Sequence, residues 1–349
     1  MMGQNKYILT ILLFFVLNCG SNQIVKQKSL NNHSNHFKIG FGSCLDQKKP
    51  MPILNSIKSE NFNLFLMLGD NVYGSSKKGD MKNMISAYTL QKQNFDKFEF
   101  NLPFEAIWDD HDYGLNDGGK EHLLKEKSKE LFLEFWDIPQ EDPRRYREGL
   151  YHDVTIYSGS KKTQILFLDT RTFRDKLKPT DNKYAPGKER YIPDLDSSLT
   201  ILGPQQWQWL VNKIAEPSDY RIIISSIQFI AIGHGWESWN NLPHERNRLI
   251  DLIDNSNLTN TIILSGDRHR GGIYKLKTEK GNTIYEVTSS SLNSSYPTNP
   301  EEAGPLRIGS TFVNENYGGL YFNDKSDTLT VSLKNINGSH LASIKIGSL

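Results

Sequence analysis

The sequence predicts an α/β protein that forms a single domain, with a largely parallel sheet and an antiparallel part packed as a second sheet. From residue 37 onward, short apolar runs alternate with helical patterns, which is typical of βα units. After residue 270, strand-like runs follow one another through Gly, Asn and Asp turns without a helix between them. No internal repeat or low-complexity linker interrupts residues 37–349, and a chain of 349 residues can form one large domain.

The first part of this domain alternates strands with helices. Strands are expected at 37–42, 63–68, 104–108, 163–168, 221–226 and 261–264. Helices are expected near 51–60, 81–98, 120–136, 204–216 and 243–254. The fourth helix has Pro204 at its start, where the fixed φ of proline suits the first helical position. Because parallel strands need a crossover connection, this alternation predicts a largely parallel sheet.

The last part of the chain contains consecutive strands. They are expected near 271–277, 282–290, 318–323, 328–334 and 341–347. Two loop-rich stretches, 174–200 and 291–317, are the candidates for insertions that face a substrate.

The composition excludes some classes of function. The formal net charge is +1, 23% of the residues are charged, and no long basic run is present, so nothing indicates a nucleic-acid partner. The sequence has no nucleophilic-serine motif and no Gly-rich nucleotide loop, which disfavours covalent hydrolases and kinases. We expect a monomer.

The amino end predicts export. Lys6 precedes an apolar run at 7–17 that is too short to span a bilayer, which needs about 20 residues. A charged residue, a short apolar run and a break fit a signal peptide over 1–18. Cys19 at the break resembles a bacterial lipoprotein processing site, although Asn18 replaces the usual small residue. We expect a lipid on Cys19 and a membrane-anchored protein on the periplasmic or outer surface. The alternatives are a signal cleaved elsewhere or an uncleaved anchor.

The two cysteines then have different expected roles. Residues 19–36 are polar and without periodicity, so they are expected to form a flexible tether. If Cys19 is acylated, Cys44 is a lone thiol in an exported protein, and metal ligation would explain it.

Four short polar phrases follow predicted strands. They are FGSC, ending at Cys44; GDNVY, with Asp70 and Tyr73; WDDHD, at 108–112; and SGDRH, at 265–269. The carboxyl ends of strands in open α/β sheets meet at one edge, where ligands bind. Carboxylate, imidazole, phenol and thiol groups at one edge are the ligand set of a hydrolytic metal centre.

Each phrase by itself has a structural alternative. Asp70 is placed to bridge two cations, but strand-Gly-Asp is a common sequence, and by itself it favours an Asp that caps a turn. Asp109, Asp110 and Asp112 would repel one another unless a cation neutralises them; the alternative is a solvated acidic turn. Asp267 and His269 share one face if the chain stays extended, and they favour neither explanation alone.

The order and spacing of FGSC, GDNVYG, WDDHDYGLND, LDTR, LGPQQWQWL, GWESW and SGDRH resemble the alkaline phosphatase D (PhoD-like) branch of the metallophosphatases, across residues 38–290. The resemblance implies a four-layer α/β/β/α sandwich with a two-metal phosphoesterase site. It also implies iron paired with calcium, with other divalent cations as alternatives, and phosphomonoester or phosphodiester substrates attacked by metal-activated water.

The resemblance also implies roles for individual residues. Asp70 would be the bridging ligand, and Cys44 and Tyr73 the unusual iron ligands. Asp110, Asp267 and His269 would complete the ligand set.

Four further residues match the family pattern. His111 would contact the substrate phosphate or protonate the leaving group. Arg171 would clamp a phosphate bidentately or form a structural salt bridge with Asp169. Asp109 and Asn116 match the motif as ligands or as neighbours of ligands.

Two departures from the family are expected. Longer members carry a β-sandwich ahead of the catalytic domain, and here FGSC begins at residue 41. The signal contains one Lys and no Arg, so twin-arginine export is not expected.

The sequence therefore predicts an exported, lipid-anchored, metal-dependent phosphoesterase. A surface binding lipoprotein that keeps the fold without turnover is the alternative, and nuclease or phospholipase specificity is open within the enzyme class. Arg144, Arg145 and Arg147 are expected on a solvated face, or else to recruit phosphate. Trp236 and Trp239 are expected to pack rather than to line a pocket.

Overall fold

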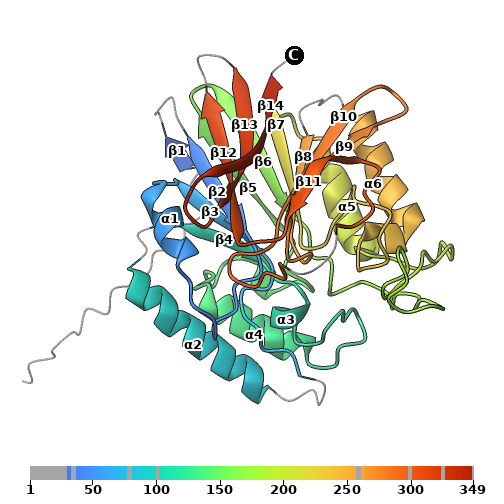
Figure 1. Ribbon diagram of the computed structural model, residues 1–349, viewed down its shortest axis with the longest axis horizontal. Helices are drawn as coiled ribbons and strands as arrows, with labels where there is room; N and C mark the ends of the chain where they lie inside the picture. Colours follow the sequence, from blue (N-terminus) through green and yellow to red (C-terminus); the bar gives the residue numbers. More distant parts are fainter. Residues whose placement is uncertain are drawn as a thin grey trace, which may run out of the picture.

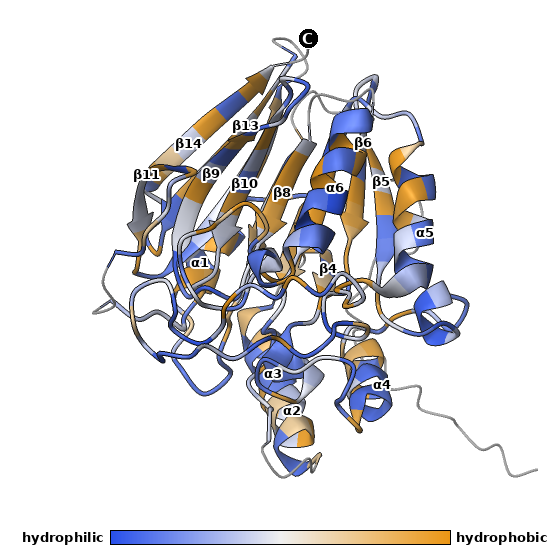
Figure 2. Ribbon diagram, turned by 90° about the vertical axis from the view of Figure 1, so that its right-hand side faces the viewer, coloured by the Kyte–Doolittle hydropathy of each residue, from blue (hydrophilic) through white to orange (hydrophobic). Residues whose placement is uncertain are grey.

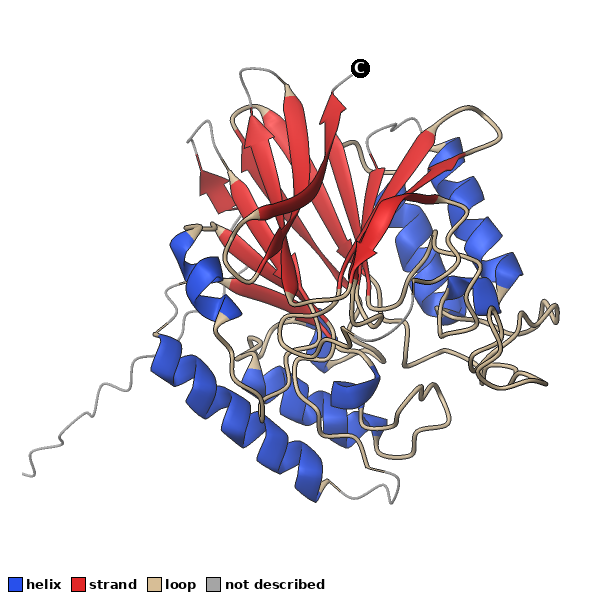
Figure 3. Ribbon diagram, viewed as in Figure 1, coloured by secondary structure: helices blue, strands red, loops and turns tan. Residues whose placement is uncertain are grey.

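Two β-sheets pack face to face at the centre of the molecule, and helices cover the outer face of each sheet (Figures 1 and 3). The computed structural model describes residues 30–32, 37–76, 81–99, 102–256, 261–297, 301–323 and 327–347. The four-layer α/β/β/α sandwich expected from the family resemblance is confirmed. The expected signal peptide and Cys19 lie outside the described residues.

One sheet contains six described strands in the order β14-β13-β12-β2-β3-β4. Its parallel half is β2 (Lys38–Gly42), β3 (Leu64–Leu68) and β4 (Phe104–Ile107). Its antiparallel half is β12 (Asn316–Asn323), β13 (Thr328–Asn335) and β14 (His340–Gly347).

The other sheet contains eight described strands in the order β1-β5-β6-β7-β8-β10-β9-β11. Its first strands are β1 (Leu30–Asn32), β5 (His152–Ser158), β6 (Lys161–Phe167) and β7 (Tyr220–Ser225). The others are β8 (Thr261–Ser265), β9 (Gly271–Lys277), β10 (Thr283–Ser289) and β11 (Arg307–Phe312).

The arrangement of strands within the sheets corrects the sequence-based expectation. The parallel strands do not form one sheet with the antiparallel strands in another. Instead β2–β4 pair with β12–β14, and β6–β8 pair with β10. An apolar strand buried on both faces does not encode its neighbours, because any strand with a matching face can pair with it.

The expected helices are confirmed. They are α1 (Ile53–Ser59), α2 (Lys82–Phe98), α4 (Lys125–Phe135), α5 (Gly203–Ile214) and α6 (Pro243–Asn255). The short elements α3 (Asp110–Tyr113), η1 (Pro143–Arg145) and η2 (Trp239–Asn241) were not expected. Nor were β1, β5 and β11, and β11 lies inside a stretch expected to be loop.

Alternating side chains build the layers. In β3, Leu64, Leu66 and Leu68 lie in the core between the sheets, whereas Phe65 and Met67 pack under α1, α2 and α4. On the far sheet, α5 and α6 cover a separate cluster of apolar residues. Figure 2 shows hydrophobic residues along the central strands and hydrophilic residues on the exposed turns of α6. Because successive side chains of a strand point to opposite faces, one strand contributes both to the core between the sheets and to the core under the helices.

Part of the expected tether is structured. Leu30–Asn32 form β1, which pairs in parallel with β5, so the tether cannot be irregular along its whole expected length. No described helix has the length and apolar character needed to cross a membrane.

Candidate metal centre

The carboxyl ends of parallel strands from both sheets meet at one edge of the sandwich, next to α3 (Figure 3). Backbone hydrogen bonds join the turns after β2 and β3, from Cys44 N–H to the Gly69 carbonyl and from Leu45 N–H to the Asp70 carbonyl. Gly266, just after β8, packs so closely that a Cβ would lie 2.7 Å from Ser43 Oγ and 2.9 Å from the Leu68 carbonyl oxygen. Only glycine allows these strand ends to come together.

Two groups of potential metal ligands share Asp70. The first is Cys44, Asp70 and His269, and the second is Asp70, Asp110 and His111; within each group the ligand atoms lie within 4.8 Å of one another. Oδ2 of Asp70 lies 3.5 Å from Cys44 Sγ, and Oδ1 accepts a hydrogen bond from the His111 backbone N–H at 3.2 Å. The two oxygens of one buried carboxylate thus face two different groups.

The backbone at four expected ligands lies in the left-handed region. The φ angles are 60° at Cys44, 51° at Asp70, 65° at Asp267 and 51° at His269. Such a conformation costs a non-glycine residue about 1–3 kcal/mol and is concentrated at functional sites. The fold therefore holds these residues in strained conformations at one place.

Several polar atoms near Asp70 are buried without hydrogen-bond partners in the described structure. They include Tyr73 Oη, Asp110 Oδ1 and Asp109 Oδ2. Tyr73 Oη lies near Cys44 and Ser294 but forms no hydrogen bond of ordinary geometry. Unpaired buried polar atoms are costly, and coordination of a cation would satisfy them. The donor set present here therefore fits metal ions.

The two histidines are held in defined orientations. Nδ1 of His269 contacts the carbonyl oxygen of Ser294, so this nitrogen carries the proton and Nε2 is left with a lone pair. Nδ1 of His111 lies 2.8 Å from Ser75 Oγ. Burial lowers the pKa of His269 to about 4, which keeps the imidazole neutral at pH 7. A neutral imidazole fixed through its other nitrogen is the usual form of a metal-ligating histidine.

Acidic groups at the centre are perturbed by burial and by one another. Burial raises the pKa of Cys44 to about 11. Burial and neighbouring acids raise the pKa of Asp70. Burial opposes ionisation of Asp110 too, but the His111 and Arg171 charges lower its pKa to about 2. Without a cation the thiol stays protonated, and a bound cation would displace that proton.

Arg171 has a different environment from either expectation. Its side chain is 0% exposed, and its guanidinium contacts Asp109 and Glu237. Among the described residues, the carboxylate of Asp169 makes no ion pair with the Arg171 guanidinium; it accepts from the backbone N–H groups of Arg171 and Thr172 and from the Thr172 hydroxyl. A bidentate clamp on phosphate would need guanidinium donors that already face the carboxylates of Asp109 and Glu237.

The other expected residues divide between the centre and its surroundings. Asp267 belongs to neither ligand group, but its pKa is raised by burial and by the charges of Asp109, Glu237 and Asp110, which places it among these acids. Asn116 is exposed. It is the neighbouring Asp117 whose backbone N–H donates to Asp110 Oδ2 at 2.7 Å.

Sequence reasoning missed several residues of this centre. Ser290 Oγ lies 3.2 Å from Cys44 Sγ and accepts from the His269 backbone N–H at 2.8 Å; it stands at the end of the strand expected near 282–290, to which no functional role was assigned. Asp112 was expected only as one of three acids that a cation would neutralise; in the structure it accepts from the N–H groups of Asp109 and Asn71 and so joins two loops of the site. Glu237, which pairs with Arg171, lies inside the GWESW phrase, for which only packing of the two tryptophans was expected.

The remaining expectations concern residues outside the centre. Trp239 is 0% exposed and packs edge-on against Trp207 and Phe229, which confirms its packing role. The guanidinium carbons of Arg190 and Arg268 lie over the ring of Trp236, at 5.1 and 5.0 Å from its centroid.

Comparison with known proteins supports one family. The PhoD-like phosphatase family matches residues 39–335. Alkaline phosphatase D of Bacillus subtilis (strain 168) is 26% identical over 280 residues, which is 67% of this chain and 45% of that protein. The chain thus spans about half the length of that curated relative.

Two solved structures share the fold. The structure of PhoD has a TM-score of 0.67 at 16% identity, covering 92% of this chain and 73% of that one. GAP50, the anchor in the inner membrane complex of Plasmodium, has a TM-score of 0.57 at 12% identity, covering 90% and 89%. At these identities the likeness shows the fold alone.

Proposed function

Because the chain belongs to the PhoD-like phosphatase family, we propose that it is a metal-dependent phosphoesterase that hydrolyses phosphomonoesters, phosphodiesters or both at a two-metal site. The observation that carries the two-metal part is the position of Asp70, whose carboxylate belongs to two ligand groups at once. A carboxylate in that position could help to hold two cations, one with each ligand group.

The donor atoms suggest which cation each side would take. Cys44, Tyr73 and His269 offer sulfur, phenol and imidazole ligands, which suit iron, and we propose Asp110 and Asp267 as oxygen ligands that suit calcium. Bound cations would supply polarisation of the phosphoryl group and activation of water. Other divalent cations remain alternatives for both positions.

The protein's own groups would handle the proton and hold the site in shape. His111 lies beside Asp70 and Asp110, and Ser75 fixes its ring. We propose that it contacts the phosphate or donates a proton to the leaving oxygen, a role in which a positioned side chain contributes about 10²–10⁴-fold in rate. Arg171 donates to Asp109, which precedes Asp110 in the chain, and this contact would keep the acidic turn in place.

Metal analysis and a substrate panel test this function together. The purified chain should contain bound metal and should hydrolyse at least one phosphomonoester or phosphodiester, including nucleic-acid and phospholipid esters. Removing the metal with a chelator should abolish turnover, and adding it back should restore turnover. Turnover that survives complete metal removal would overturn the proposal. Bound metal with no turnover on any ester would favour the binding lipoprotein instead.

We further propose that the protein is exported and anchored through a lipid on Cys19, on the support of the amino-terminal sequence alone. Cys19→Ser should release the chain into the soluble fraction with unchanged turnover, since residue 19 precedes the folded part. A variant that stays on the membrane after signal cleavage would contradict lipidation at this residue.

A further inference from the structure

Four arginine side chains lie around the acidic residues of the metal centre: Arg171, Arg174, Arg190 and Arg268. Three of them are at most 8% exposed, and their guanidinium groups pair with Asp109, Glu237 or Glu302. The side chain of Arg190 is 37% exposed, and it pairs with the carboxylate of Asp117 at 2.7 Å. Because a substrate cannot reach a buried guanidinium, Arg190 is the one of these four that can contact a negatively charged ligand.

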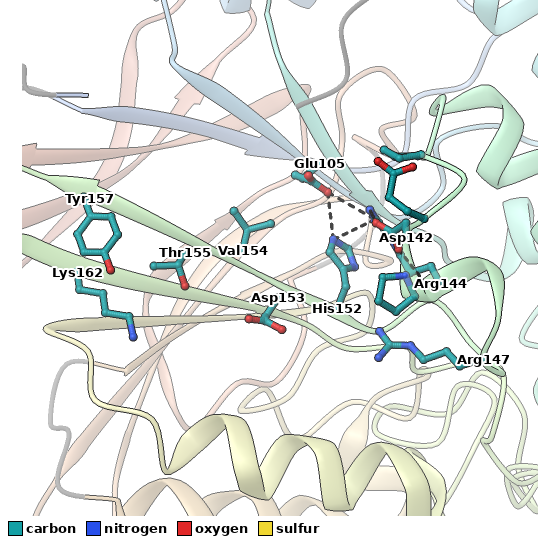
Figure 4. A pocket seen from close by; sticks show the side chains of 13 residues that line it. Glu105, Asp142, Arg144, Arg147, His152, Asp153, Val154, Thr155, Tyr157 and Lys162 are labelled. Atoms are coloured by element: carbon teal, nitrogen blue, oxygen red, sulfur yellow. Dashed lines mark hydrogen bonds and ion pairs between the residues drawn. The ribbon is translucent and has the colours of Figure 1, made fainter. Parts of the chain in front are cut away.

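The basic cluster that was expected in solvent, or else to recruit phosphate, makes other contacts. Arg144 is buried and pairs with Asp142 at 2.8 Å. Arg145 is half-buried and donates to two backbone carbonyls, and the half-buried Arg147 lies 3.8 Å from the centroid of the Tyr151 ring. Figure 4 shows Arg144 and Arg147 beside a cavity whose lining shares no residue with either ligand group. The expected solvated face is therefore wrong.

Asp117 connects Arg190 to the metal centre. Its backbone N–H donates to Asp110 Oδ2 at 2.7 Å, and its own Oδ2 accepts from Arg190 Nη1 at 2.7 Å. Burial opposes the charge of Arg190, but the charges of Asp117 and Asp267 raise the pKa of Arg190 above its usual value. The guanidinium therefore lies near both Asp110 and Asp267, the two residues that we proposed as oxygen ligands.

The backbone and the side chain of Arg190 are both held in place. The backbone N–H groups of Arg190 and Tyr191 donate to the Gly235 carbonyl at 2.9 and 2.7 Å, and the guanidinium carbon lies 5.1 Å from the centroid of the Trp236 ring. Among the described residues, the guanidinium donates through Nη1, and its Nε and Nη2 form no hydrogen bond. These two nitrogens make up one side of the guanidinium fork, which can bind two oxygens of a phosphate at once.

We propose that Arg190 binds the substrate phosphate through Nε and Nη2, the role that the buried Arg171 cannot take, and that it makes phosphomonoesters the preferred substrates. This inference rests on the proposed phosphoesterase function and names a residue that selects the substrate. A phosphomonoester carries close to two negative charges at pH 7 and three non-bridging oxygens. A phosphodiester carries one charge and two such oxygens, so the guanidinium attracts the monoester more strongly.

Binding of inorganic phosphate to the metal-loaded protein tests the contact without turnover. Arg190→Met keeps an unbranched side chain beside Trp236 but removes the guanidinium, so the dissociation constant measured by calorimetry should rise at least about tenfold. Tyr191→Phe is the matched control, because the Tyr191 hydroxyl donates to the same Asp117 oxygen at 2.7 Å; its constant should stay close to that of the parent. Equal weakening in both variants would show that Arg190 only holds Asp117, and would overturn the proposal, as would a parent protein that binds no phosphate.

Turnover of two nitrophenyl esters tests the preference for phosphomonoesters. Arg190→Met should lower kcat/KM for nitrophenyl phosphate more than for bis-nitrophenyl phosphate, and Arg190→Lys should recover part of the loss, because it restores the charge without the fork. Equal losses on the two esters would contradict the preference. Phosphate binding that depends on Arg190 in a protein that cleaves no ester would instead contradict the phosphoesterase function, so the two failures are distinguishable.

Discussion

Nε of Arg171 donates to Oδ1 of Asp109 at 2.6 Å, across the boundary between the two sheets. Asp109 follows β4 in the six-stranded sheet, and Arg171 follows β6 in the eight-stranded one. Ser226, after β7, donates to the same oxygen at 2.6 Å. The edge at which the proposed metal ligands lie is therefore held from both sheets by charged and polar contacts.

Replacing Arg171 by Met should destabilise the fold strongly. Removing one partner of a buried ion pair leaves a carboxylate without a counter-charge, which costs about 3–5 kcal/mol; here Asp109 would lose the guanidinium that faces it, whereas Glu237 would keep Arg174 at 3.0 Å. Denaturant unfolding measures the change. Lys188→Met, which breaks the exposed pair with Asp181, is the control and should change little. A phosphate-clamping Arg171 would instead lower turnover with stability intact.

Replacing Asp70 by Asn should abolish turnover while the fold is kept. The variant removes a charge shared by both ligand groups, and loss of such electrostatic stabilisation should lower kcat by at least about 10³-fold. Metal analysis of the variant should show weakened binding, and circular dichroism should be unchanged. Near-normal turnover on every substrate cleaved by the parent protein would refute a shared carboxylate.

Replacing Tyr73 by Phe tests the proposed iron. Phenolate bound to oxidised iron absorbs visible light, so the purified protein should be violet to brown, and the variant should lose most of that band. Tyr73 Oη is buried and without a hydrogen bond in the described structure, so the missing hydroxyl should cost little stability. An iron-free protein that is colourless and fully active would rule out this assignment.

Cys44 should resist alkylation while metal is bound and should react once the metal is stripped, because a ligating thiolate is shielded. In the metal-free protein, burial raises the pKa of this thiol to about 11, so the reaction should accelerate as the pH rises toward 11. Mass spectrometry of the modified protein follows the rate. Equal reactivity with and without metal would argue against Cys44 as a ligand.

Stability should fall as the pH drops below 6.5, partly because of His152. Burial and the Arg144 charge lower the pKa of His152 from 6.5, so the neutral ring is the folded form. Its contribution is complete above pH 6.5 and is lost as the pH falls through the lowered pKa. Glu105, Asp142 and Arg144 face the ring, and the pKa values of the two carboxyls are themselves lowered.

Denaturant unfolding between pH 8 and pH 5 measures this effect. The His152→Gln variant should lose less stability over that interval than the parent protein, since a proton-binding group of the unfolded chain is gone. Parallel curves for the two proteins would show that His152 does not contribute.

The local features of the site were predictable from sequence. An apolar run ending in Gly-Asp70 predicts a strand with an acid at its carboxyl end, and the structure has β3 ending at Leu68 with Asp70 next to the other proposed ligands. Cys44, Asp110, His111 and His269 follow strands or strand ends in the same way. The alternation of apolar residues and the position of each polar phrase after a strand are local properties, so they can be predicted from a single sequence.

The partners of charged side chains were not predictable in this way. Arg171 was expected to face phosphate or Asp169, and it contacts Asp109 and Glu237, which lie 62 and 66 positions away in the chain. Arg144 was expected in solvent, and it is buried against Glu105 and Asp142. The burial and the partner of a charged side chain depend on which distant segments pack over it, and these segments cannot be predicted from the local sequence.

The sequence by itself determined that the chain is α/β, where its strands and helices lie, and which residue types stand at the strand ends, because backbone hydrogen bonding and hydrophobic periodicity act over a few residues. The tertiary structure alone decided that the parallel strands divide between two sheets and that Asp70 belongs to two ligand groups. Those outcomes depend on contacts between residues far apart in the chain, and such contacts form only when the layers pack on one another.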